Sequence, residues 1–427
     1  MSARGAAHAL LLGLAWLGAS GGALATEASS FGVGPRSRAL AGAGATQDCG
    51  SEATFVNPAA LAFAERPTVT AGFGVRRAWL YWQRSGGAEQ RTDAAAVSLS
   101  ELGFTLPLPL LELPLVLGFV SASANGSVAH ARLPLAEEPQ FPLVGARARA
   151  VDFDLALGLQ AARFLSLGLG VRALSSLSGT TEVVRDEKTT STRVRDTLEP
   201  VLAPLAGISA KLADTSLALV ARAPLRADFA MHLSAVDLGA SQLPPLELAG
   251  VAAYDPWTFA LELSRKLGAV TALVSGEYQR FRDTPPLLPA TVRCAAERPD
   301  CGALPTEPAN FHDTVNLRFA AQWHVPLRRG AEGRLSAGYA FLPTPIPEQT
   351  SDANFLDNSR HRFALGYGIE LDAPLPPVAL DAAASFDQLS ARTSHKAANV
   401  PESNPGAPEL RSRGHLLGLS LALTVKL

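Results

Sequence analysis

Histidine and serine side chains are the groups in this chain with the chemistry for nucleophilic catalysis. A serine hydrolase needs a histidine base within hydrogen-bond reach of its serine, and that serine usually lies in a recognisable turn motif. His361 and His415 are candidates for the base, but no nucleophile motif surrounds any serine of the chain. Both histidines lie near the ends of expected strands. The sequence therefore favours a protein that is not an enzyme.

Three arginines have the chemistry to bind an anion inside the protein: Arg172, Arg318 and Arg362. Each belongs to the polar half of a segment in which apolar and polar residues alternate, so each is expected on the polar face of a strand. Two interpretations remain open. The arginines bind the acidic group of a ligand, or they neutralise acids on the same polar faces. Such acids include Asp152, Asp154 and Glu370.

The segment that ends the chain shows the alternation most clearly. In RSRGHLLGLSLALTVKL, every second residue from Leu417 to Leu427 is apolar, and the residues between them are small or polar. Successive side chains of a strand point to opposite faces, so one face of this strand is apolar and the other is not. The same pattern covers residues 151–160, 165–172, 314–323 and 362–371.

The whole pattern predicts fourteen strands, at residues 68–82, 94–107, 113–124, 146–160, 164–180, 197–212, 215–232, 247–264, 267–283, 312–326, 331–344, 359–372, 376–392 and 411–427. A soluble sandwich also alternates, but its strands usually have about 5 or 6 residues. Here the segments are much longer, and short connections alternate with long ones. The fold class predicted is an all-β, 14-stranded antiparallel transmembrane β-barrel of the outer membrane, because a closed barrel leaves no unpaired backbone in lipid.

The first 25 residues have the features of a signal peptide. Arg4 is followed by an apolar stretch and by Ala23-Leu24-Ala25, a small-x-small cleavage site, so the mature chain is expected to begin near Thr26. After it, no run of 18 apolar residues predicts a transmembrane helix. The net charge is −2, which does not indicate a nucleic-acid partner.

The cysteines fit an exported protein better than a metal site. Cys294 and Cys301 frame the sequence AAERPD and are expected to form a disulfide, which leaves Cys49 as an odd thiol that we expect to be inert. Their spacing does not supply the ligands of a metal site. The glycines between Gly32 and Gly44 do not form a phosphate-binding loop, since no strand precedes them and no P-loop lysine follows. No metal or cofactor is therefore expected.

Residues 26–67 lack the alternation and precede the barrel domain, which we place at 68–427. This segment is rich in glycine and alanine and contains the uncharged stretch ATFVNPAALAF, which is too short to span a membrane. Small residues allow a compact segment to pack in a confined space. We therefore expect residues 26–67 to form a small hatch that plugs the barrel.

Two groups of motifs resemble the FadL-type family of long-chain fatty acid transport proteins. RSRALAGAGATQDCGSEATFVNPAALA is similar to the family's N-terminal hatch, through Arg36, Ser37, Ala39, Gly42, Ala43, Phe55, Asn57, Pro58, Ala59 and Leu61. A late AGYA…P.P pattern matches at Ala337, Gly338, Tyr339, Ala340, Pro345 and Pro347. The resemblance covers essentially the whole mature chain, although residues 83–145 contain no motif that aligns.

The resemblance implies passive uptake of hydrophobic molecules, most simply long-chain fatty acids, by hatch rearrangement and lateral release through the barrel wall. Asn57, Pro58, Ala59 and Phe55 would then shape or gate the hatch, and the choice between these two roles stays open. Pro114 and Gly118 are candidates for the lateral opening, because proline or glycine inside a strand often marks a bulge.

The resemblance also assigns roles to ligand-contacting residues. A fatty acid carboxylate would bind one of the three arginines, and apolar loop residues would form an outer capture groove: Phe311, Phe341 and Phe355. The expected partners are this hydrophobic ligand and outer-membrane lipid, with the protein acting as a monomer. The alternatives are uptake of aromatic or alkane hydrocarbons, and a structural or secretion-linked barrel that transports nothing. An open polar porin is disfavoured by the hatch.

Overall fold

The computed structural model describes the 427-residue chain apart from residues 1–25, 48, 93–95, 111–112, 126–129, 132–136, 145–147, 150, 187–188, 237–245, 286–290, 294–309, 329 and 372–375. The expected signal peptide and the pair Cys294 and Cys301 therefore lie outside the described residues.

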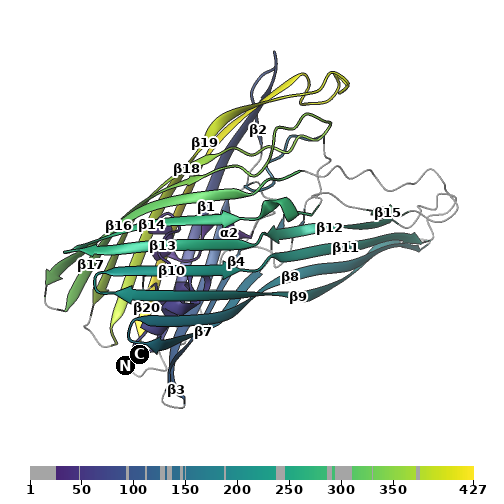
Figure 1. The fold of residues 1–427 in the computed structure, drawn as a ribbon. Helices are drawn as coiled ribbons and strands as arrows, with labels where there is room; N and C mark the ends of the chain where they lie inside the picture. Colours follow the sequence, from purple (N-terminus) through teal and green to yellow (C-terminus); the bar gives the residue numbers. More distant parts are fainter. Residues whose placement is uncertain are drawn as a thin grey trace.

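Long strands in the described part of the chain form a closed 14-stranded antiparallel ring (Figure 1). The strands of the ring are β1 (Thr68–Arg84), β3 (Val97–Leu110), β4 (Leu113–Ala124), β7 (Val151–Ala162), β8 (Leu165–Asp186), β9 (Thr189–Leu212), β10 (Thr215–Arg222), β13 (Thr258–Leu267), β14 (Val270–Gln279), β16 (Thr314–Arg328), β17 (Ala331–Leu342), β18 (Arg360–Leu371), β19 (Val378–His395) and β20 (Glu409–Lys426). The ring closes because β1 pairs with β20 along its whole length as well as with β3. This confirms the predicted barrel.

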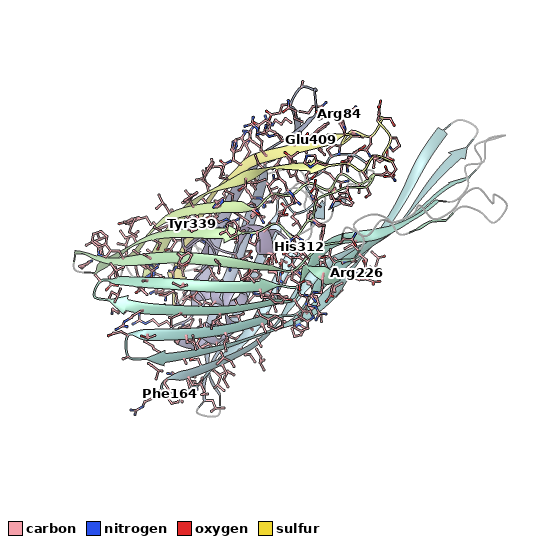
Figure 2. The ribbon with its side chains drawn as sticks, turned by 45° about the horizontal axis from the view of Figure 1, so that its top comes forward. Arg84, Phe164, Arg226, His312, Tyr339 and Glu409 are labelled. Carbon is pink, nitrogen blue, oxygen red and sulfur yellow. The ribbon has the colours of Figure 1, made fainter. Side chains whose placement is uncertain are left out.

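The two faces of the barrel wall differ in composition as the alternation predicts. On β20, Leu417, Leu419 and Leu421 are exposed on the outside, whereas Ser420 and Ala422 are buried on the inside. Other strands repeat this pattern, so large apolar side chains cover the outer surface (Figure 2). Soluble proteins rarely expose apolar patches of this extent, and a barrel surrounded by lipid requires them.

Two of the predicted strands are interrupted. The segment predicted at 215–232 is divided into β10 and β11 (Leu225–Val236), and the one predicted at 247–264 is divided into β12 (Leu246–Asp255) and β13. Pro224 and Pro256 lie at the two breaks, where a residue without a backbone N–H cannot continue the ladder.

Beyond the breaks, the strands form a sheet that extends away from the ring. There β11 pairs in parallel with β8 and antiparallel with β12, and β12 pairs with β15 (Thr291–Arg293). Together with β9, these strands project to the right in Figure 1. Three further short strands are β2 (Gln90–Thr92), which pairs antiparallel with the end of β1, and the pair β5 (His130–Ala131) and β6 (Ala148–Arg149).

Tight turns gather at one end of the barrel, which we call the turn end. Ala213, Gly268 and Gly330 have φ values of 51°, 64° and 74°, the left-handed conformation that such turns need. Phe164 marks this end in Figure 2, and Arg84 and Glu409 mark the opposite end, which we call the loop end. The prediction of short connections on one side and long ones on the other is thus confirmed for the described residues.

Residues 26–67 form short helices inside the ring (Figure 1). They are α2 (Glu27–Phe31), α3 (Pro35–Ala39), η1 (Gly50–Glu52), α4 (Ala53–Val56) and η2 (Pro58–Phe63), and a further turn, η3 (Phe281–Asp283), lies in a loop. The helices of the hatch contact β4, β7, β8 and β9 on one side and β17, β18 and β19 on another. None of the helices in the described part of the chain is long and apolar enough to cross a membrane.

Replacement of an outward-facing leucine by arginine tests the lipid-facing surface. Leu365 is 63% exposed near the middle of β18. Leu365→Arg should lower the free energy of unfolding in lipid vesicles by about 2–4 kcal/mol, because lipid does not solvate the charge. Urea titration measures this change. Ala88→Arg, in an exposed loop, should leave stability unchanged, and equal effects of the two variants would contradict a lipid-facing belt.

Candidate functional site

The Asn57-Pro58-Ala59 turn is held by the Asn57 side chain. Asn57 is 0% exposed, and its Nδ2 donates to the Ala45 carbonyl at 2.6 Å and to the Ser209 Oγ at 2.8 Å. Its Oδ1 accepts from the Ala59 N–H at 3.1 Å, which caps η2, and Pro58 occupies the first helical position. Asparagine is a favoured cap, and proline is pre-organised for a first turn. The turn is thereby joined both to the hatch and to β9.

Glycines of the wall form the floor on which this turn rests. Gly158, Gly168 and Gly207 are direct neighbours across β7, β8 and β9. A Cβ on Gly168 would lie 2.2 Å from the Ala59 nitrogen, and one on Gly207 would lie 2.0 Å from the Asn57 Oδ1. Both distances are far shorter than any allowed contact. Hatch backbone therefore lies directly against wall backbone, which explains why this polar face carries glycine.

Phe55 lies between two arginine side chains of the wall. The guanidinium carbons of Arg172 and Arg222 are 4.9 Å and 5.0 Å from the centre of its ring, and Arg222 Nε donates to the Phe55 carbonyl at 3.4 Å. Buried cation–π contacts of this kind contribute about 2 kcal/mol. Phe55 is thus an anchor of the hatch rather than a free apolar group.

Arg172 is the centre of a buried ion-pair network. It points into the barrel, as the alternation predicts, and is 1% exposed. It contacts Asp152 at 2.8 Å, Asp154 at 3.2 Å and Asp255 at 3.1 Å. Because its donors are occupied by these carboxylates, the interpretation that it neutralises lumenal acids fits the geometry better than ligand binding.

The other two predicted arginines also point inward and are also paired. Arg318 contacts Glu277 at 2.8 Å, and Glu277 in turn contacts Arg222 at 3.4 Å. Arg362 contacts Asp387 at 2.8 Å and donates to the carbonyl of Ser30 in the hatch at 3.0 Å. Glu370, proposed as a partner for these arginines, pairs with Lys426 instead.

Several further hatch–wall contacts were missed by the sequence analysis. Arg36 contacts Asp381 at 2.8 Å, and Arg38 pairs with Glu101. Glu262 on β13 accepts from the N–H groups of Gly44 and Thr46, each at 2.8 Å. The acids lie at inward positions of the alternation, so the sequence could have predicted that they point into the lumen. Their partners on the hatch follow no periodic pattern, so the sequence could not have predicted which residues pair.

Glu52 is a buried carboxylate within the hatch. It accepts from the N–H groups of Arg36 and Ser37, at 3.0 Å and 2.8 Å, and so fixes the start of α3. Burial raises the pKa of Glu52 from 4.5 to about 8, although these hydrogen bonds and the charge of Arg36 act in the opposite direction.

Solved structures with a similar fold include a FadL homologue, a toluene transporter and a monoaromatic hydrocarbon channel. A FadL homologue from Pseudomonas aeruginosa is 15% identical over 95% of this chain and 99% of its own, with a TM-score of 0.63. The toluene transporter TodX of P. putida is 14% identical over 93% and 99%, with a TM-score of 0.57. The monoaromatic hydrocarbon channel CymD is 15% identical over 93% and 98%, with a TM-score of 0.54. No family model and no curated protein matches the sequence.

The chain has the FadL-type fold. Its hatch occupies the lumen of the FadL-type barrel, and the ion pairs, the glycine floor and Asn57 fix the hatch in place. All of the hatch–wall contacts described above are non-covalent. The hatch therefore fills the lumen through contacts that can each break and form again.

An apolar cap covers the loop end of this FadL-type barrel. We define the outer cap as residues 137–144 and 343–358. Phe311 and Phe355 are buried there in a cluster with Leu143, Phe281, Ile346 and Ala353. The cap is held by hydrogen bonds such as Gln140 N–H to the Asn354 carbonyl, at 3.1 Å. Both phenylalanines thus lie in one loop cluster, where they are buried.

Phe341 lies elsewhere, outside the lumen. Leu335, six residues before Phe341 and therefore on the same face of β17, is exposed on the outer surface. Phe341 also contacts the ring of His361, with 5.2 Å between centroids. An odd-numbered residue of β17 points outward because the strand alternates. The expectation that Phe341 joins Phe311 and Phe355 is therefore not met by its position.

The wall around the predicted lateral opening is continuous in this structure. β4 pairs with β3 from Leu113 to Ala124 and with β7 from Leu115 to Ser123, without a bulge. Gly118 faces the hatch, and a Cβ there would lie 2.5 Å from Leu61. Gly118 therefore makes room for the hatch rather than a kink in the strand.

A polar cavity of about 650 Å³ lies between the hatch and the wall at the turn end. Gln47 and Glu65 of the hatch line it together with Lys211, Asp214 and Lys266. Cys49 is buried nearby in the hatch, 3.7 Å from the Gly44 carbonyl. No cluster of three metal-ligating side chains occurs among the residues that the structure describes.

The pH dependence of stability tests the placement of Glu52. The folded protein binds the Glu52 proton more tightly than the unfolded chain, so stability should fall between pH 4.5 and about 8, by about 1.4 kcal/mol per unit at most. Glu52→Gln mimics the neutral form and should flatten this slope in chemical unfolding. Glu402→Gln, at an exposed position, should keep it. A wild-type slope equal to that of Glu52→Gln would refute the assignment.

Addition of one methyl group tests the glycine floor. Gly168→Ala places a Cβ against the Asn57-Pro58-Ala59 turn and should displace η2, which raises ion conductance in planar bilayers. Gly276→Ala is a matched control, because a Cβ on this strand glycine meets no atom within 4 Å. Unchanged conductance of a folded Gly168→Ala barrel would show that the hatch does not need this floor.

Proposed function

We propose that the protein is an outer-membrane channel for passive uptake of hydrophobic molecules, and that long-chain fatty acids are its ligands. One observation carries this proposal: a barrel with an apolar outer surface whose lumen is filled by a hatch held through reversible polar contacts. A FadL homologue and hydrocarbon channels have a similar fold, which supports the proposal. A polar porin, in contrast, needs an open lumen.

In this proposal, release of the hatch opens the path. Leu61 of η2 fills the space that side chains at Gly118 and Gly158 would occupy, on β4 and β7. Movement of η2 would leave a gap lined by wall backbone at this place. Lateral release next to Gly118 and Pro114 therefore needs displacement of the hatch and no prior break in β4. Asn57, Pro58 and Ala59 would act as the hinge of that movement.

The ligand would enter through the outer cap. Phe311 and Phe355 are packed in the apolar cluster at the cap. An apolar ligand could take the place of some of these side chains, because its contacts with the cluster would be of the same hydrophobic kind. Below the cap, Leu80, Leu389 and Leu416 continue the apolar surface toward the lumen. An aliphatic chain would be buried along this surface.

Arg360 is a better candidate for the carboxylate of a fatty acid than the arginines proposed from the sequence. It lies at the loop end of β18 on the inward face, between Leu342 and Leu389 of the neighbouring strands. Its Nη1 is buried and has no hydrogen-bond partner among the described residues. A carboxylate there would satisfy this donor, and its chain would reach the apolar surface under the cap.

Uptake of labelled oleate by a strain that lacks its own transporter tests the function. The protein should raise uptake above the empty vector, and Arg360→Ala should reduce that gain by about tenfold or more, as loss of a charged hydrogen bond predicts. Arg91→Ala, at an exposed position of β2, should match the wild type. Toluene uptake should not depend on Arg360.

Other outcomes would replace the proposal. Uptake of toluene or an alkane without uptake of oleate would indicate the hydrocarbon alternative. No uptake of any apolar molecule by a folded barrel at normal abundance would favour a structural or secretion-linked barrel.

A further inference from the structure

The first residue of the hatch is bound by a buried carboxylate of the wall. Thr26 is 6% exposed, and its backbone nitrogen donates to Asp255 Oδ1 at 3.2 Å. Its hydroxyl donates to Asp255 Oδ2 at 2.8 Å, and the Ser29 hydroxyl donates to the same oxygen at 2.5 Å. Asp255 thus holds the beginning of the hatch through several contacts.

Asp255 belongs to a network in which carboxylates outnumber cations. The network has four carboxylates and three guanidinium groups: Asp152, Asp154, Asp255 and Glu277, with Arg172, Arg222 and Arg318. Ion pairs connect them, and the ring of Phe55 lies between Arg172 and Arg222. Four acids therefore face three cations, and a buried charge without a partner is strongly destabilising. In addition, the Oδ1 atom of Asp152 is buried and has no hydrogen-bond partner in the described part of the chain.

The residues before Thr26 suggest the source of the missing cation. Ala23-Leu24-Ala25 is a small-x-small cleavage site, and hydrolysis after Ala25 makes Thr26 the first residue of the mature chain. Water splits the amide, so that Ala25 keeps a carboxylate and the nitrogen of Thr26 becomes an ammonium group. This nitrogen is the atom that already contacts Asp255.

We propose that signal-peptide cleavage between Ala25 and Thr26 creates a buried α-ammonium group that binds Asp255 and latches the hatch to the barrel wall. The new charge balances the network around Arg172. An ammonium also has three donors where the amide has one, and Thr26 neighbours Asp152 as well as Asp255.

This contact between the Thr26 ammonium group and Asp255, which we call the latch, requires cleavage at one position. A mature chain that began one residue earlier would place its charge about 3.8 Å further along the chain and return a neutral amide to Asp255. Uncleaved precursor would lack the charge altogether. The hatch is thus fully held only in the processed protein.

The first experiment uses the wild-type protein purified from outer membranes. Intact mass should show a chain that begins at Thr26. An amine-reactive label should modify exposed lysines of the folded protein while labelling the Thr26 amine at least about tenfold more slowly, with the difference lost on denaturation. A different N-terminus, or equal labelling rates in the folded barrel, would overturn the proposal.

The second experiment separates the charge from the fold. Insertion of Gly-Ser between Ala25 and Thr26 leaves the cleavage site intact but moves the ammonium group away. This insertion and Asp255→Asn should each lower Tm, and together they should lower it no further than the larger single effect, because they remove one interaction.

Asp313→Asn is the matched control, since Asp313 pairs with Arg282 and Tyr278 and belongs to a separate ion pair. Its effect should add to that of the insertion. A Gly-Ser insertion between Gly86 and Gly87, in an exposed turn, should leave Tm unchanged. Additive effects of the insertion with Asp255→Asn, or an unchanged Tm of the inserted protein, would refute the latch.

Discussion

Pairing of charges inside the barrel is the constraint on which the rest of the structure depends. Arg172, Arg318 and Arg362 are on the wall, and each is matched by a carboxylate within 3.2 Å. In an interior with little water, a charge without such a partner is strongly destabilising. The inward positions of the wall therefore need charged residues of matching sign. The hatch supplies some of the partners, because Arg36 and Arg38 pair with carboxylates of the wall.

Steric fit is the second part of the same design. Ion pairs hold the hatch to the wall, but the turn at Asn57 comes closer to the wall than any side chain would permit. Gly158, Gly168 and Gly207 accept it because glycine has no Cβ. The charged contacts and the close backbone contacts occur on neighbouring strands, so hatch movement must release both kinds of contact together.

This combination gives the closed lumen a particular character. Buried ion pairs hold one arrangement specifically, yet their net contribution to stability is small because desolvation offsets the attraction. Apolar contacts hold the hatch as well, because Phe31 packs against Val97 and Leu99 of β3. The ion pairs therefore add specificity of placement to this apolar packing.

Much of the fold was predictable because its periodicity is local. Residues alternate along each strand, and Leu417 to Leu427 alone indicate which face is apolar. The count of fourteen, the closure and the inward direction of the three arginines follow from that pattern. The breaks at Pro224 and Pro256 were also visible in the sequence, and the long apolar segments around them led to single strands being predicted.

The site was less predictable because its contacts join residues far apart in the chain. Asn57 and Pro58 were identified from a motif, but Ser209, which binds Asn57, belongs to no motif. Arg360 lies two residues before Arg362 on the same face of β18, but Arg362 pairs with Asp387 whereas the buried Nη1 of Arg360 has no hydrogen-bond partner among the described residues. Phe341 was assigned to the loops, whereas its place in the alternation of β17 directs it outward.

The sequence by itself determined the wall of this protein. The strand period, the strand length and the alternation of short and long connections are sufficient to predict a barrel, because successive residues along the chain set the two faces of each strand. Tertiary structure decided how the wall is used. Which carboxylate meets which arginine, which glycines lie under the hatch, and where the nitrogen of Thr26 comes to rest all depend on ring closure around residues 26–67. Closure brings together groups such as Arg36 and Asp381, which are 345 residues apart, and no local pattern encodes such a pairing.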